Sequence, residues 1–420
     1  MSRRSVRPRQ VHVVGAGLAG LSAAVRLASR GLAVTVHEAT HQAGGRCRSY
    51  YDSTLGLEID NGNHLILSGN QAALSYLDLI DARAGLTGPS SASFPFIDLA
   101  TGERWTLRAN DGIIPWWLLD PARRVPGARL GEYLALAKLL RAKAGATIGE
   151  TISCSGPLYA RLIEPLLMSA LNTEPRSGSA ALAAAVIRET LAAGGRNYRP
   201  LIARNGLSNV FVAPALRCIA GHGGSVNYGR RLRRLALDAD RVSALDFGDT
   251  SIQLTSHDAI VLAVPPAVAG SLLPELSTPT ESRAIVNAHF RIDPPAALAP
   301  MIGVVNGMTQ WLFAFPQRLS VTISAADDLL ELSREDLAQR IWREVAVIAN
   351  LPDAMPGWQI VRERRATFAA VPGEEAKRPG AETAWENLVL AGDWTRTGLP
   401  ATIEGAIRSG ATAAGLVAAL

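Results

Sequence analysis

The stretch QVHVVGAGLAGLSAAVRLASRGLAVTVHEA, residues 10–39, decides the fold of this 420-residue chain. An apolar run at 11–14 precedes a group of glycines, after which apolar residues recur at helical spacing from Leu18 to Ala28. Gly31 ends that helix, and a second apolar run at 33–37 leads to Glu38. The pattern predicts a strand, a helix and a second strand, which is the βαβ unit of a parallel sheet.

Three glycines between the first strand and the helix have the spacing of a dinucleotide-binding loop. Gly15 permits a tight turn, Gly17 lets the backbone approach a diphosphate, and Gly20 lets helix and strand pack closely. The helix start adds free N–H groups and partial positive charge. Glu38 is placed to accept hydrogen bonds from ribose hydroxyls, and it would repel the 2′-phosphate of NADP. The predicted dinucleotide contacts are Gly15, Ala16, Gly17, Leu18, Ala19, Gly20, Glu38 and Ala39.

A second glycine pair, Gly44-Gly45, is followed by Arg46 just beyond this acid. Simple NAD dehydrogenases do not need this addition, whereas a longer cofactor does. Arg46 can neutralise a phosphate, and the glycines admit the flavin end. These residues therefore favour FAD over NAD.

Two further segments resemble parts of the same kind of sheet. Residues 257–266, HDAIVLAVPP, predict a buried strand stopped by paired prolines, and residues 388–391 predict another strand. A helix is expected from about Thr402, with Glu404 and Arg408 as an i,i+4 pair. The expected fold is α/β. A discontinuous Rossmann-like FAD-binding domain covers 8–70, 205–265 and 385–420, and an inserted α+β substrate domain covers 71–204 and 266–384.

These motifs together resemble the glutathione-reductase-type FAD superfamily, in the branch that holds amine oxidases, phytoene desaturases and protoporphyrinogen oxidase. In that branch a closing strand ends in Gly-Asp before a helix, as Gly392-Asp393 does here. The resemblance implies that Asp393 binds the ribityl or phosphate region and that Thr402 and Ile403 face the flavin at the positive end of the last helix. It also implies a backbone contact from Leu232 to adenine.

Within that branch, three stretches resemble the bacterial squalene-associated desaturase-like proteins, the hydroxysqualene dehydroxylases. They are DNGNHLILSGN (60–70), PLLMSALNTEP (165–175) and GDWTRTGLPATIEGAIRSG (392–410). The resemblance implies an FAD-dependent enzyme that removes the hydroxyl of hydroxysqualene to give squalene, in hopanoid-type biosynthesis. Hydride would pass from reduced flavin N5 to an allylic cation. The implied partners are a long apolar isoprenoid and a reductant, either NADPH or a redox protein.

Two rival functions remain on the same scaffold. A carotenoid- or phytoene-type desaturase or an amine oxidase would move hydride in the opposite direction, and FAD motifs do not set direction. A GDP-dissociation-inhibitor-like module would bind a prenyl group without catalysis, but it has no need of the full flavin contact set.

His64 is the candidate catalytic acid, and it follows Gly62 and Asn63, which the resemblance places near the flavin. Packing or orienting the flavin is the alternative role for His64. Asp60 could orient this histidine or cap the turn, and Asn172 is either a substrate contact or a helix-end amide. No second histidine lies at ligand spacing, so we predict no metal site.

The amino-acid composition narrows the remaining classes of function and the expected cellular location. The net charge is +5, yet only Lys138, Lys143 and Lys377 are lysines, and no nucleic-acid-binding motif accompanies the arginines. Three isolated cysteines favour a reducing compartment. We therefore expect a cytoplasmic protein that binds no nucleic acid, with a basic N-terminal arm. Residues 111–130, which include Trp116-Trp117-Leu118-Leu119 and Arg123-Arg124, predict peripheral contact with the inner face of the cytoplasmic membrane.

Overall fold

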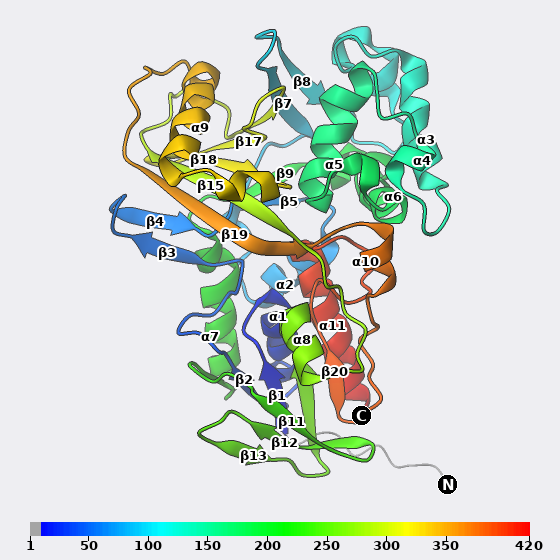
Figure 1. The fold of residues 1–420 in the computed structure, drawn as a ribbon, viewed down its shortest axis with the longest axis vertical. Coiled ribbons are helices and arrows are strands. Elements are labelled where there is room, and N and C mark those ends of the chain that lie inside the picture. Colours follow the sequence, from blue (N-terminus) through cyan, green and yellow to red (C-terminus); the bar gives the residue numbers. More distant parts are fainter. Residues whose placement is uncertain (1–9) are drawn as a thin grey trace.

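A computed structural model describes residues 10–420 and shows a molecule with two ends (Figure 1). The lower end in Figure 1 holds a parallel sheet with helices α1 and α11 beside it, and the upper end holds a larger sheet flanked by α9 on one side and α3 to α6 on the other. Strand β19 runs between the two ends. The predicted basic arm lies at residues 1–9, outside the described part of the chain.

The parallel sheet confirms the βαβ prediction. Its order is β10-β2-β1-β14-β20, and every neighbouring pair is parallel. The strands come from three distant parts of the sequence, all inside the segments predicted for the FAD-binding domain. The strands are β1 (Gln10–Val14), β2 (Ala33–His37), β10 (Ser225–Asn227), β14 (Asp258–Leu262) and β20 (Leu388–Leu390).

Three helices pack beside this sheet: α1 (Leu18–Ala28), α7 (Ala213–Gly221) and α11 (Ile403–Ala419). Small residues let α1 and α11 approach closely, since a Cβ on Gly410 would lie 2.2 Å from the Ala19 carbonyl oxygen. The buried Glu404 carboxylate accepts hydrogen bonds from the Ala72 and Ala73 amides (3.0 and 2.8 Å), at the start of α2 (Gln71–Leu79). The expected Glu404–Arg408 pair is present at 3.0 Å. The first and last helices are thus joined into one support for the glycine loop.

The larger sheet has seven strands in the order β19-β15-β18-β17-β16-β7-β8, and only β16 and β7 are parallel neighbours. One face packs on α9 (Arg334–Ala349) through alternate apolar residues such as Val286, Ala288 and Phe290. The strands are β7 (Ser93–Asp98), β8 (Arg104–Arg108), β15 (Ser282–Arg291), β16 (Met301–Val305), β17 (Trp311–Phe315), β18 (Arg318–Ile323) and β19 (Trp358–Phe368).

The opposite face of this sheet changes character along its width. At β15 and β18 it is polar, and the Asn287 side chain donates to the Asn61 carbonyl oxygen (3.3 Å). At β17 and β7 it is aromatic, with Phe96 stacked on Trp105 and tilted against Trp311. Because side chains alternate along a strand, this face is turned away from α9.

The remaining elements connect these two sheets or cover them. None of the helices in residues 10–420 is long and apolar enough to cross a bilayer. The small strands form a hairpin of β3 (Ser49–Asp52) and β4 (Leu57–Asp60), a sheet of β11 (Arg234–Asp238), β12 (Arg241–Asp246) and β13 (Ser251–Gln253), and a sheet of β5 (Leu65–Leu67), β9 (Pro200–Ala203) and β6 (Leu86–Thr87). The other helices are α3 (Leu134–Leu140), α4 (Ile148–Thr151), α5 (Glu164–Leu171), α6 (Ala180–Glu189), α8 (Pro266–Leu272) and α10 (Pro372–Ala376).

Candidate cofactor site and active site

The glycine loop between β1 and α1 has the geometry that a dinucleotide requires. The Gly15 N–H donates to the His37 carbonyl oxygen (2.7 Å), and Gly15 has a positive φ of 103°. A Cβ on Gly20 would lie 1.9 Å from the Gly15 carbonyl oxygen, so that position accepts only glycine. A Cβ on Gly17 would meet nothing within 4 Å. Gly15 and Gly20 therefore shape the loop, while Gly17 leaves open space at the start of α1.

Gly17→Ala should affect mainly FAD binding, whereas Gly20→Ala should affect mainly the stability of the fold. Gly17 has an extended conformation that alanine adopts freely, so the apoprotein should keep its stability within about 1 kcal/mol. Its FAD affinity should fall about tenfold, because the new methyl group occupies the space predicted for the diphosphate. Gly20→Ala should destabilise the apoprotein itself, because helix and loop must move apart. Chemical denaturation and FAD titration of both apoproteins measure this contrast, and equal effects of the two substitutions on FAD affinity and stability would contradict it.

Glu38 is buried at the end of β2 and holds the loop from the other side. Its carboxylate accepts hydrogen bonds from the Ala16 N–H (2.8 Å) and from the Thr40 N–H and hydroxyl (both 2.9 Å). The Arg230 N–H donates to the Glu38 carbonyl oxygen (2.8 Å), and buried Leu232 lies two residues beyond Arg230. The structure thus brings Glu38 together with the segment that holds Leu232, while Ala39 is exposed next to them.

The second glycine pair packs directly on the first loop. The Gly44 N–H donates to the Ala16 carbonyl oxygen (2.8 Å), and a Cβ on Gly45 would lie 3.3 Å from the Gly17 Cα. Both glycines have positive φ, 106° and 58°. The two glycine motifs are therefore in direct contact, and this contact places Arg46 at the same site.

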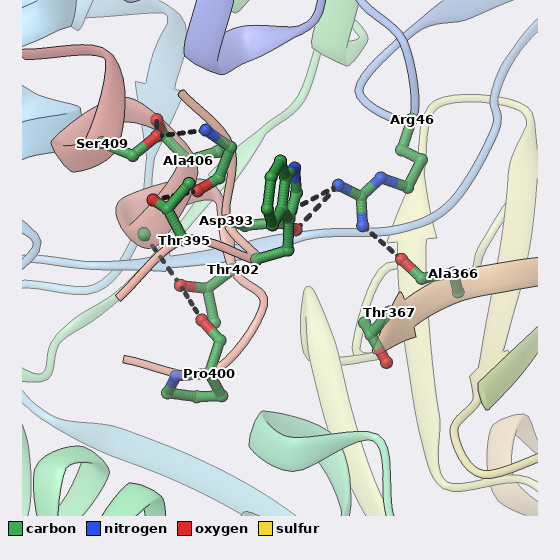
Figure 2. Close-up of polar contacts among 12 residues, drawn as sticks. Arg46, Ala366, Thr367, Asp393, Thr395, Pro400, Thr402, Ala406 and Ser409 are labelled. Carbon is green, nitrogen blue, oxygen red and sulfur yellow. Dashed lines mark hydrogen bonds and ion pairs between the residues drawn. The ribbon is translucent and has the colours of Figure 1, made fainter. Parts of the chain in front are cut away.

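Arg46 and Asp393, 347 residues apart in sequence, form an ion pair with N–O distances of 2.7 and 2.8 Å (Figure 2). The Arg46 guanidinium also donates to the Ala366 carbonyl oxygen on β19. The Asp393 charge raises the pKa of Arg46, so this guanidinium stays protonated. The Asp393 side chain is only 7% exposed, whereas that of Arg46 is 44% exposed and free to contact a further anion.

The start of α11 lies beside this ion pair (Figure 2). The Thr402 hydroxyl caps the helix by accepting from the Gly405 N–H (3.0 Å), and Ile403 is the first helical residue. The Gly392 N–H donates to the hydroxyl of Ser409, nearly two turns into the same helix (2.7 Å), which fixes the approach to Asp393. A helix of 17 residues places partial positive charge at this end.

These residues fit FAD. Gly17 leaves room beside free helix N–H groups, Glu38 offers a carboxylate to a ribose, and Arg46 offers a partly exposed guanidinium to a phosphate. The start of α11 supplies positive charge where a reduced flavin is negative. Assignment of the individual residues to parts of FAD stays a prediction.

Asp60 holds the turn that leads to His64. Its carboxylate accepts hydrogen bonds from the Ser49 hydroxyl (2.6 Å) and the Leu207 N–H (2.8 Å). It also pairs with Arg318 of β18 at 3.3 Å, and both side chains are buried. Asp60 thus ties β4 to the seven-stranded sheet, a role beyond the two that the sequence indicated, orienting His64 or capping the turn.

Gly62 and Asn63 lie against the polar face of the same sheet. The Asn63 side chain donates to the Thr322 hydroxyl (3.0 Å) and the Val321 carbonyl oxygen (3.3 Å). A Cβ on Gly62 would come within 3.2 Å of the Asn287 side-chain nitrogen. Asn63 Oδ1 is buried and has no hydrogen-bond partner among the residues described. This orphan acceptor is consistent with a polar ligand at the turn.

His64 lies among these charges, and burial lowers its pKa to about 4. The Asp60 carboxylate opposes this shift, and the Arg46 guanidinium adds to it. The imidazole is therefore neutral at pH 7 and has no proton to donate from a cationic form. The role of His64 as catalytic acid stays a prediction, and the low pKa counts against it.

His64→Gln should keep turnover within about threefold of wild type between pH 6 and 8, because a residue that is neutral throughout this range supplies no titrating proton. Flavin content and the pH profile of kcat/KM measure the effect. A loss of more than about 100-fold with intact FAD would instead establish His64 as the acid.

Two residues of this region carried no sequence signal. Arg318 stands in an ordinary strand pattern, and Arg378 precedes a proline, yet both side chains are buried against charged or carbonyl groups. Asn172 ends α5, and its side chain donates to Thr367 Oγ1 (2.9 Å) and accepts from the Ala325 N–H (2.7 Å), which favours the helix-end amide over the substrate contact. Only the pairing of distant segments identifies these roles.

Comparison with known proteins assigns the chain to a protein family. The sequence profile described as "Flavin containing amine oxidoreductase" matches residues 18–418. The chain belongs to this family. It is an FAD-dependent oxidoreductase, with the predicted α/β fold.

Relatives and solved structures agree with this placement. The chain is 58% identical to a hydroxysqualene dehydroxylase of Rhodopseudomonas palustris, covering 98% of this chain and 99% of the relative. It is 55% identical to that of Sinorhizobium fredii, over 97% and 98% of the two chains. Cyclohexylamine oxidase from Brevibacterium oxydans shares the fold with a TM-score of 0.73 at 17% identity, over 98% of this chain and 99% of the oxidase.

Proposed function

We propose that this oxidoreductase removes the hydroxyl of hydroxysqualene reductively to give squalene. The observation that carries the proposal is identity of 47–58% over at least 96% of the chain with three proteins named hydroxysqualene dehydroxylase. At this identity and coverage, the relatives share the whole architecture and not the cofactor loop alone.

The chemistry divides between cofactor and protein. Reduced FAD, when bound, supplies the hydride that replaces the hydroxyl, which takes up a proton and leaves as water. Glu38, Arg46 and Asp393 would hold the cofactor, and the hydride transfer requires that the closed site exclude water. At the aromatic end of the seven-stranded sheet, Trp311 is partly exposed above buried Phe96, and its ring has the apolar character that an isoprenoid requires.

The two rival functions, a desaturase or amine oxidase and a prenyl-binding module, explain fewer of these observations. Solved amine oxidase structures at 17–18% identity share the fold alone, and a 24% match to a phytoene desaturase covers 47% of this chain. A prenyl-binding module without catalysis leaves unexplained why the glycine loop, Arg46 and Asp393 meet at one place. The direction of hydride transfer then follows from the dehydroxylase relatives.

Removing the cofactor tests catalysis against simple binding. Purified protein should show flavin absorbance, and FAD-stripped protein should convert no hydroxysqualene until FAD and a reductant are restored. A colourless protein that still binds isoprenoids and has no affinity for FAD would favour the binding module.

Three finer points are also proposed. Residues 8–70, 205–265 and 385–420 form the FAD-binding domain, and 71–204 with 266–384 form the substrate domain. The substrate is a long apolar isoprenoid. The reductant is NADPH or a redox protein, and the sequence has no second GxGxxG for a nicotinamide.

A fourth proposal is peripheral contact of the protein with a lipid surface. It is based on one group of exposed hydrophobic side chains. Six exposed large hydrophobic side chains fall within 113–134, namely Ile113, Ile114, Trp116, Leu119, Leu130 and Leu134. Trp116 and Leu119 are 63% and 61% exposed in one 3₁₀ turn. Trp117, predicted for the same contact, is instead buried against Tyr133, and this packing joins the turn to the segment that leads into α3.

The charge around this surface suits anionic lipid. Residues 108–143 contain seven basic and three acidic side chains, a net charge of +4. Interfacial segments combine aromatic and aliphatic side chains with such basic neighbours. An insoluble substrate would then enter from the bilayer.

Trp116→Ser with Leu119→Ser should weaken binding to vesicles of 70% phosphatidylcholine and 30% phosphatidylglycerol by about fivefold or more, because two exposed apolar side chains that would insert into the bilayer are lost. Co-sedimentation measures it, with Val347→Ser as the control, since Val347 is 64% exposed on α9. Wild-type protein that stays in the supernatant would contradict the proposal, as would a double variant that binds as well as wild type.

A further inference from the structure

Arg378 lies fully buried beneath the loop that carries Asp393. Its guanidinium donates hydrogen bonds to three successive backbone carbonyls, those of Asp393 (3.1 Å), Trp394 (3.3 Å) and Thr395 (3.1 Å). It also donates to the Thr397 hydroxyl (3.0 Å). A single side chain therefore binds three of the five backbone carbonyls of residues 393–397.

The charge of Arg378 is compensated locally. Its Nη1 pairs with the Glu375 carboxylate at 2.7 Å, and its Cζ lies 4.8 Å from the centre of the Phe368 ring. The backbone next to Arg378 also contacts this loop, since the Arg396 N–H donates to the Pro379 carbonyl oxygen (2.7 Å). A buried guanidinium with this many acceptors fixes the shape of the loop it contacts.

Two arginines thus hold Asp393 from opposite ends of the residue. Arg46 binds the carboxylate, and Arg378 binds the carbonyl oxygen of the same residue. Both arginines also contact β19, Arg46 through the Ala366 carbonyl oxygen and Arg378 through the Phe368 ring. The loop after β20 is therefore fastened to the strand that joins the two ends of the molecule.

We propose that Arg378 is a positioning residue for FAD binding: it fixes loop 393–397 so that the Asp393 carboxylate faces the cofactor. The role goes beyond the proposed reaction and rests only on FAD binding at this site. Arg378 itself acts through Asp393 and through the loop. Lysine cannot replace it, because one ammonium cannot reach three carbonyls, a hydroxyl and a carboxylate in these directions.

FAD titration of the apoproteins of Arg378→Met, Arg378→Lys and Glu375→Gln tests this role. We expect affinity to fall about 30-fold for Arg378→Met, about tenfold for Arg378→Lys and about threefold for Glu375→Gln. The matched control is Arg362→Met, since Arg362 also donates to two backbone carbonyls, those of Leu330 and Leu332, away from this loop. Its FAD affinity should stay within about twofold of wild type.

Two further measurements distinguish positioning from general stability. Amide hydrogen exchange of the Arg378→Lys apoprotein should be faster in residues 392–400 and unchanged in β1 and α1. In an Asp393→Ala background, Arg378→Met should change FAD affinity by less than about threefold, because the group it positions is gone. The proposal is overturned if the Arg378 variants bind FAD like wild type. It is also overturned if they exchange faster throughout the protein or if the two substitutions are additive.

Discussion

Replacing Asp393 with alanine is expected to lower FAD affinity by about 100-fold while the apoprotein stays folded. The carboxylate is nearly buried and fixes the Arg46 guanidinium in place. Without it, the Ala366 carbonyl oxygen is the remaining partner of the guanidinium, which is too little to fix a side chain that is 44% exposed. The loop keeps its own contacts, such as the hydrogen bond from the Thr395 hydroxyl to the Gly392 carbonyl oxygen (2.8 Å). Cofactor binding should therefore suffer far more than stability.

Fluorescence titration of FAD into the stripped protein measures this effect, and urea denaturation of the apoprotein measures the fold. Asp78→Ala is the matched control, because it breaks an exposed ion pair with Arg83 at 2.7 Å. That control should change FAD affinity by less than about twofold, since exposed pairs contribute little. An Asp393→Ala protein that keeps wild-type affinity would remove Asp393 from the cofactor site.

Replacing Asp60 with alanine is expected to lower the free energy of unfolding by about 3–5 kcal/mol, the largest effect on stability that we predict. The substitution leaves the Arg318 guanidinium buried without its carboxylate, and the Phe315 ring at 4.5 Å compensates only in part. It also removes the acceptor of the Leu207 N–H and the Ser49 hydroxyl. The cost therefore comes from desolvated groups that lose their partners.

Adding Arg318→Met to Asp60→Ala should recover about 2 kcal/mol, because an apolar side chain of similar length needs no counter-charge. Urea denaturation of the two single variants and the double variant gives the coupling free energy. If Asp60→Ala costs less than about 1 kcal/mol, or if the double variant recovers nothing, the buried pair does not join β4 to β18 as described.

The parts of the site that were predictable from sequence are those coded by local spacing. Gly15, Gly17, Gly20 and Glu38 act within one βαβ unit, so their order along the chain fixes their relation in space. The start of α11 at Ile403 is equally local, since Thr402 caps it from the adjacent position.

The partners of these residues were not predictable, because they depend on which distant segments meet. Arg46 and Asp393 were each expected near the cofactor, but their mutual ion pair requires β20 to return beside β14. Asp60 was assigned to its own turn, whereas its ionic partner lies 258 residues away on β18. Likewise Trp116 and Trp117 look alike in sequence, and only packing on Tyr133 decides which is exposed.

The central claim is that reduced FAD in this protein converts hydroxysqualene to squalene. A single-turnover experiment without oxygen tests it most directly: the protein is loaded with FAD, reduced chemically and mixed with hydroxysqualene. We expect about one squalene formed for each flavin oxidised. Flavin that stays reduced with hydroxysqualene unchanged would contradict the account. In a parallel sample with oxidised FAD, reduction of the flavin while hydroxysqualene gains a double bond would contradict it too.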